Sequence, residues 1–147
     1  MIKAHELRIG NLVKDRGGKI IRIDFFENES RPNIIKFGQR VYLGETEVHG
    51  LTEYSDFAEP IPITEELLIK AGFKVLESSV YKQFYIGINP VTKDWLFDLA
   101  WLEKPELIGA PNVPFYRNGY HAIHFVHQLQ NLYFALTGEE LIFEGLN

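Results

Sequence analysis

The chain has 147 residues, enough for one compact domain or two very small ones, and its 46% hydrophobic and 14% aromatic content can fill a core. It contains no cysteine, which excludes disulfides, cysteine metal sites and cysteine nucleophiles. The net charge of −5 is unevenly spread: residues 1–40 carry nine Lys and Arg against five acids, and the remainder carries six against fifteen. Such a split hints at polar recognition, although solvated strand faces are the simpler explanation.

The sequence gives no sign of targeting or of a membrane segment. The first residues, MIKAHELRIGN, have no apolar core of signal-peptide length. No run approaches the roughly 20 apolar residues that a membrane helix needs. We therefore expect a cytoplasmic protein that does not enter a membrane.

The first part of the chain has the pattern of short β-strands. The pattern predicts a hairpin: a strand that ends at Lys14, a glycine-rich turn over residues 15–18 and a β-branched strand over residues 19–25. In this hairpin Ile21 and Ile23 lie on one face. Further strands are expected at 33–37, 40–43 and 47–51, separated by glycines such as Gly38. Residues 1–52 thus resemble the start of a small SH3-like β-barrel, or form a meander.

Residues 53–63 read as a connector that ends in the extended segment Pro60-Ile61-Pro62. Thr64 is placed to cap a short helix over residues 65–71, which Gly72 ends. Residues 64–147 then form an α+β part, either as a separate subdomain or within one continuous compact domain.

Alternating apolar residues predict strands over 80–88 and 95–102, and prolines mark a loop over 103–113. Asn118-Gly119 is a strong hairpin signal, which pairs 113–117 with 120–124. Residues 140–143 are expected to return as a last short strand. The whole chain is therefore predicted to be α+β, with an antiparallel sheet packed against one long C-terminal helix and one short helix.

The long helix is expected to start near Val126 and to end at Gly138. Apolar residues recur every three or four positions and predict its buried stripe: Phe125, Val126, Leu129, Leu132, Tyr133 and Leu136. His127, Gln128, Gln130 and Asn131 are expected on the other side. Amides on a helix face suggest internal hydrogen bonds more than simple solvation.

Three runs of the sequence resemble a family of small proteins of uncharacterised activity from Bacteroides-type gut bacteria and their phages. They are LRIGNLV at residues 7–13, IPITEELLIKAGF at 61–73 and VHQLQNLYFALTGEEL at 126–141. The resemblance implies that the chain belongs to a phage or another mobile element. It implies no activity, substrate, cofactor or site residue.

His121, His124 and His127 are spaced three apart, which raises the question of a metal site. With 120–124 in a strand and the helix starting at Val126, the three side chains should diverge, so polar or capping roles are expected instead. Asp94 and Asp98 share a strand face without a partner acid. We predict no catalytic, cofactor-binding or metal-binding residues.

Four basic residues of the first hairpin, Lys14, Arg16, Lys19 and Arg22, could meet phosphates, with Phe37 and Tyr42 as stacking surfaces for bases. The acidic remainder argues against strong nonspecific binding. The sequence favours a non-enzymatic accessory module that binds an unknown protein partner. A nucleic-acid-binding module that uses this hairpin is the alternative, and an enzyme with a composite site is a third hypothesis.

Overall fold

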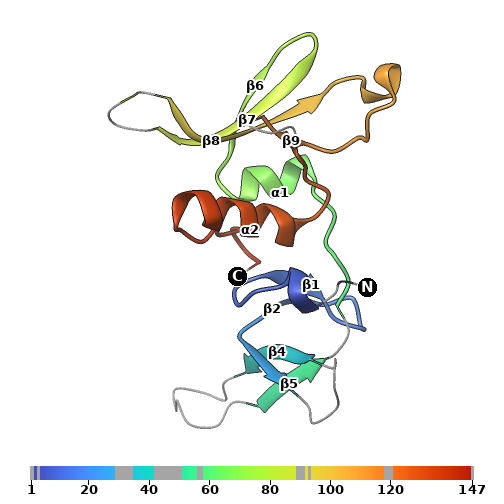
Figure 1. Cartoon of the computed structure of the whole chain (residues 1–147), viewed down its shortest axis with the longest axis vertical. Coiled ribbons are helices and arrows are strands. Elements are labelled where there is room, and N and C mark those ends of the chain that lie inside the picture. The colour runs from blue at the N-terminus through green and yellow to red at the C-terminus, as the bar shows by residue number, and fades with distance from the viewer. Residues whose placement is uncertain are drawn as a thin grey trace. The chain divides into compact units, whose positions relative to one another are not determined.

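The structure is a computed structural model, and it describes residues 2, 4–28, 35–41, 51–55, 58–88, 92, 94–117 and 121–146. The chain divides into two compact units, Met1–Ile61 and Pro62–Asn147. The fold is α+β, with antiparallel strands in three sheets, and the α-helices of the described residues lie in the second unit (Figure 1). A membrane-spanning helix needs about 20 mainly apolar residues, and none of the helices in the described part of the chain meets that requirement.

The first unit begins with the 3-10 helix η1 (Ala4–Glu6) and the predicted hairpin, formed by β1 (Leu12–Lys14) and β2 (Ile20–Arg22). Val13 pairs with Ile21, and both side chains are buried. They join Ile2, Leu7, Ile23 and Ala58 in a small hydrophobic core. The β-branched residues therefore pack inward, as the strand period requires.

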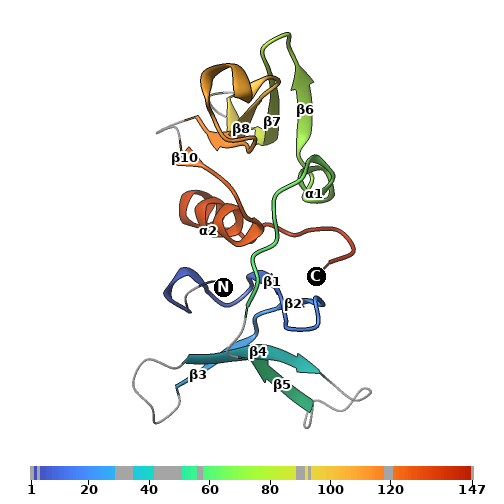
Figure 2. The same cartoon turned by 90° about the vertical axis from the view of Figure 1, so that its right-hand side faces the viewer.

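Three further strands of this unit form a meander: β3 (Phe25–Asn28), β4 (Ile35–Val41) and β5 (Leu51–Ser55), which lie side by side in Figure 2. The described residues form this sheet and the hairpin separately, and not one closed barrel. Gly38 was expected to separate two strands, but it lies inside β4 and pairs with Phe25 and Tyr54. Parts of the expected strands at 33–37, 40–43 and 47–51 lie outside the described residues.

The predicted connector 53–63 is also wrong in its first part. Residues 53–55 belong to β5, which pairs with β4, and Glu59 forms a β-bridge with Lys14. The division between the units falls after Ile61, beside the proline-rich end of the expected connector. Paired backbone ties the segment to the first unit, because a bridged strand cannot act as a free linker.

The second unit contains a five-stranded antiparallel sheet in the order β10-β9-β8-β7-β6. Its central strands, β7 (Tyr81–Ile88) and β8 (Trp95–Leu102), match the predicted positions. β9 (Phe115–Tyr116) and β10 (His121–Ala122) form the predicted second hairpin, whose Asn118-Gly119 turn lies outside the described residues. The edge strand β6 (Lys74–Glu77) was not predicted. The loop over 103–113 contains a second 3-10 helix, η2 (Pro105–Ile108).

Helix α1 (Glu65–Lys70) and helix α2 (Val126–Thr137) lie on the same side of the five-stranded sheet (Figure 1). Thr64 caps α1 as predicted, since its hydroxyl accepts a hydrogen bond from the Leu67 amide at 3.2 Å. The sheet face toward the helices carries Phe84, Phe97 and Leu99, all buried, and the Phe97 ring meets Tyr133 of α2 edge-on. We call this the inner face.

The ends of α2 agree with the sequence, but its predicted faces do not. Gly138 ends the helix with φ of 75°, the left-handed conformation that glycine adopts easily. His127 and Gln130 were expected on a polar side, yet both are fully buried, whereas Leu136 is 51% exposed. The buried side of α2 lies between the predicted apolar stripe and these two polar residues. The apolar residues alone therefore predict the wrong side of the helix to be buried.

The predicted final strand over 140–143 is also wrong, because these described residues belong to no strand. Leu141 and Phe143 are buried, which accounts for the alternation in the sequence. The Glu144 amide donates to the Lys70 carbonyl at the end of α1, so the segment is tied to a helix end and not to a sheet.

Candidate functional site

The four predicted phosphate contacts do lie together on the first hairpin. Lys14 is half-buried at the end of β1, and Arg16 is exposed in the turn. Lys19, just before β2, and Arg22, the last residue of β2, are also exposed. The stacking residues cannot be placed beside them, because Tyr42 and the side chain of Phe37 lie outside the described part of the structure.

Two carboxylates are built into the same hairpin. Asp15 accepts hydrogen bonds from the amides of Gly17 and Lys19, both at 2.9 Å, and so shapes the turn. Asp24 accepts from the Arg22 guanidinium at 3.0 Å. Half of the predicted positive charge is therefore offset by neighbouring carboxylates, which weakens this hairpin as a phosphate site.

The three histidines occupy different environments: His121 is exposed on β10, His124 is exposed before α2, and His127 is buried within α2 against the ring of Phe125. Within the described residues, no three metal-ligating side chains come together. The side-chain oxygen of Gln128 accepts hydrogen bonds from the backbone amides of His124 and Phe125, at 3.0 and 3.2 Å. It thereby satisfies backbone donors at the start of the helix.

The face of the five-stranded sheet opposite the helices is a surface that the sequence analysis did not anticipate. One register row crosses all five strands and is mainly apolar: Leu76, Gln83, Ala100, Phe115 and Ala122. The neighbouring rows add Tyr81 with Leu102, and Lys74 with Tyr85 and Asp98. We call these residues, with Leu96 and Arg117, the outer face.

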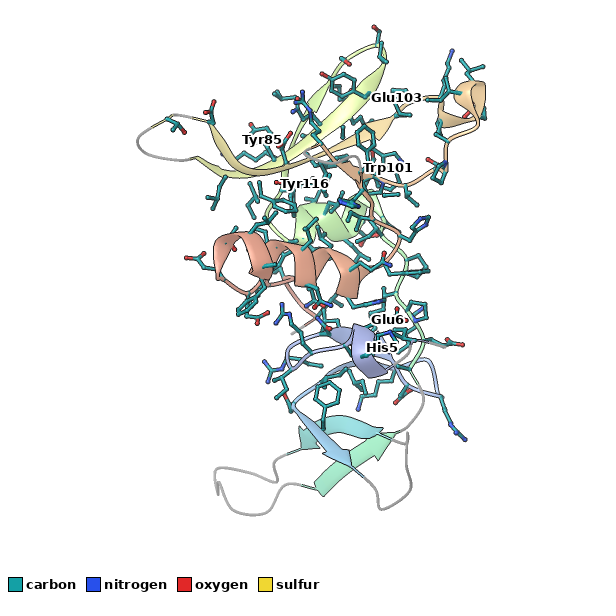
Figure 3. All side chains as sticks on the ribbon, in the orientation of Figure 1. His5, Glu6, Tyr85, Trp101, Glu103 and Tyr116 are labelled. Atoms are coloured by element: carbon teal, nitrogen blue, oxygen red, sulfur yellow. The ribbon has the colours of Figure 1, made fainter. Side chains whose placement is uncertain are left out.

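Several large side chains of the outer face are open to solvent, whereas Gln83 and Ala100 at the centre of the row are buried. Leu76 and Leu96 are 48% and 47% exposed, and Tyr81, Tyr85 and Phe115 are partly exposed. Tyr116 and Tyr85 lie on opposite faces of the sheet (Figure 3). The ring of Tyr116 stacks on Phe97 and so belongs to the inner face, whereas the strand register places Tyr85 on the outer face. Exposed aromatic and apolar groups that gather on one rigid surface are typical of interaction sites.

A polar link crosses the centre of the outer face. The Gln83 amide donates to Asp98 at 2.9 Å, and the Arg117 guanidinium lies 3.5 Å from the same carboxylate oxygen. The sequence indicated no partner acid for Asp98, and the structure gives it an amide partner on β7 and a basic partner directly after β9. Because this carboxylate is already paired, covering it would cost less than covering a lone charge.

A pocket of about 270 Å³ lies at one end of the same sheet. Its lining includes Glu65 at the start of α1 and Lys82 of β7, whose charged atoms are 2.7 Å apart. The hydrogen bond that Lys82 donates to Glu65, opposed in part by desolvation, raises the pKa of Lys82 above its ordinary value. Lys82 therefore faces the pocket as a cation that is already paired with a carboxylate.

Neither the outer face nor the pocket was found from the sequence, although part of the signal was present. Strands 81–88 and 95–102 carry large apolar or aromatic residues on both faces, which is unusual for a sheet with one solvated side. No protein-family model, curated protein or solved structure matches the chain. The resemblance to a family of Bacteroides-type bacteria and phages therefore stays a prediction.

Proposed function

We propose that the chain is a non-enzymatic protein-interaction module, and that its second unit binds a partner protein over the outer face. The observation that carries the proposal is the exposure of Leu76 and Leu96 beside the partly exposed rings of Tyr81, Tyr85 and Phe115. Burying exposed apolar surface of this kind is the main favourable term in protein association.

The composition of the outer face also favours a protein partner. Tyrosine, phenylalanine and arginine are enriched at the centre of protein interfaces, where lysine and glutamate are depleted. Here Tyr85, Phe115 and Arg117 lie on adjacent rows, and Lys74 is at the edge strand. The family resemblance adds the context of the proposal: an accessory protein of a phage or mobile element.

Site-specific photocrosslinking in the host tests this function. A photoreactive phenylalanine analogue in place of Tyr85 should capture a discrete partner protein, because this ring lies in the middle of the outer face. The same analogue in place of Ile69, an exposed apolar residue of α1, is the matched control. Equal crosslinks from both positions, or none from Tyr85, would contradict the proposal.

A second candidate function is nucleic-acid binding by the hairpin of β1 and β2. The specific observation in its favour is the gathering of Lys14, Arg16, Lys19 and Arg22, three of them exposed, on one short hairpin. A salt titration with single- and double-stranded DNA and RNA tests it, since phosphate contacts release counterions.

The expected result is affinity that falls steeply with salt and is lost in the double variant Arg16→Glu plus Arg22→Glu. Lys70→Glu plus Lys104→Glu changes the net charge equally within the second unit and should leave binding in place. Absent binding at low salt would rule out this second function.

A further inference from the structure

The pocket at the end of the five-stranded sheet has a chemistry distinct from that of the outer face. It is lined by side chains of both charges, an amide and an indole ring: Glu65, Lys82, Trp101, Leu102, Glu103 and Asn112. Trp101 and Glu103 lie at the same end of the sheet, beside the segment that carries η2 (Figure 3). The pocket has a volume of about 270 Å³, which suits a ligand the size of one small ring.

Hydrogen bonding within the pocket fixes the direction of its amide. The Trp101 indole nitrogen donates to the Asn112 side-chain oxygen at 2.9 Å. An indole nitrogen is a donor only, so the oxygen of the amide must face it. The amide nitrogen of Asn112 is thereby left to donate to a ligand.

The charges of the pocket are interleaved. Lys82 is held by Glu65 at 2.7 Å and lies 4.0 Å from Glu77, and Glu103 is near enough to act on it electrostatically. An anion in the pocket would meet carboxylates, and a cation would meet the Lys82 ammonium. A neutral ligand whose groups both donate and accept hydrogen bonds meets no such repulsion.

Hydroxyl groups both donate and accept, and a pyranose ring carries several of them around an apolar C–H face. The negative face of an aromatic ring attracts such slightly positive C–H groups, and Trp101 offers the indole of this pocket. We propose that this pocket binds a neutral saccharide, one pyranose unit stacked against Trp101 with hydroxyls bonded to Glu103, Lys82 and Asn112.

Tryptophan fluorescence of the full-length chain tests this site. The chain has two tryptophans, and Trp95→Phe leaves Trp101 as the reporter. The probes are the methyl pyranosides of glucose, galactose, mannose and N-acetylglucosamine. At least one should give a saturable change with a Kd of about 1 mM, the range of a small ligand held by a few hydrogen bonds.

In the same Trp95→Phe background, Asn112→Ala and Glu103→Ala should each weaken that binding about tenfold, because each removes one hydrogen bond. Both residues are exposed, so circular dichroism should show an intact fold. Leu107→Ser, in exposed η2 and outside the lining, is the control and should bind normally.

Three results would overturn the proposal. These are no response to any of the four pyranosides, unchanged affinity in both pocket variants, and an equal response to glycine or to methylammonium. The last result would identify a site for amino acids or cations instead of saccharides.

Discussion

The two faces of the five-stranded sheet use the same strands for different purposes. On the inner face, Phe97 and Leu99 of β8 are buried against the helices at 2% and 0% exposure. On the outer face, Leu96 of the same strand is 47% exposed. Because side chains alternate along a strand, adjacent residues can hold the fold together and remain available to a partner. The inner face should control stability, and the outer face should control binding.

The largest expected effect breaks the inner face. Leu99→Ala removes a fully buried side chain and leaves a cavity, so it should lower the free energy of unfolding by about 2–5 kcal/mol. Leu96→Ala, the same change on the outer face, should cost less than about 1 kcal/mol, as surface substitutions usually do. Urea unfolding of the two variants measures the difference, and equal losses would show that the faces do not differ.

Two glycines with nearly the same backbone angle sharpen the comparison. Gly87 has φ of 66° and Gly109 has φ of 67°, so alanine at either position should cost about 1–2 kcal/mol for the left-handed conformation. A Cβ at Gly87 would also lie 3.0 Å from the Cβ of Leu96, whereas a Cβ at Gly109 would stand in open space. Thermal unfolding should therefore show a larger loss for Gly87→Ala, and similar losses would contradict this packing of the outer face.

The inner face should also respond to alkaline pH through Tyr133. Burial, with a contribution from Glu139, raises the pKa of Tyr133 above 10.0. A raised folded-state pKa gives stability that is complete below the unfolded value and is lost as pH rises through the folded value. Tyr133→Phe should therefore lose less stability above pH 10 than the wild type, as denaturant unfolding across pH would show. A parallel loss in both proteins would contradict this reading.

The smallest effect concerns the polar link of the outer face. Arg117 is about half exposed where it meets Asp98 at 3.5 Å, so Arg117→Ala should change the free energy of unfolding by no more than about 1 kcal/mol. The variant should nevertheless weaken partner binding, because arginine is among the residues that dominate interface energies. If Arg117→Ala strongly lowered the free energy of unfolding but left partner binding normal, Arg117 would serve stability and not binding.

Local signals in the sequence predicted much of the fold. The cap at Thr64, the left-handed end at Gly138 and the alternation along β7 and β8 are each decided by neighbours within a few residues. Strand β6 was missed because its four residues do not alternate regularly between apolar and polar. The strand forms because it pairs with β7. Gly38 was read as a break because its pairing on both sides is nonlocal.

The sites were less accessible to sequence reasoning than the fold. The hairpin cations could be predicted, because they are neighbours in the chain. The pocket joins Glu65 to Asn112, and the outer face joins Leu76 to Phe115, so both depend on strand order and register. The burial of His127 and Gln130 likewise could not be read from a helix pattern, because polar residues give no apolar signal.

Partner recovery with paired charge variants tests the central claim most directly. The double variant Leu76→Glu plus Leu96→Glu places charge on the outer face at two half-exposed positions, so the chain should stay folded and lose the partner captured at Tyr85. Ile69→Glu plus Ile142→Glu makes the same change at exposed positions elsewhere and should retain the partner. If the folded outer-face variant retains the partner as well as this control does, the outer face is not the binding surface.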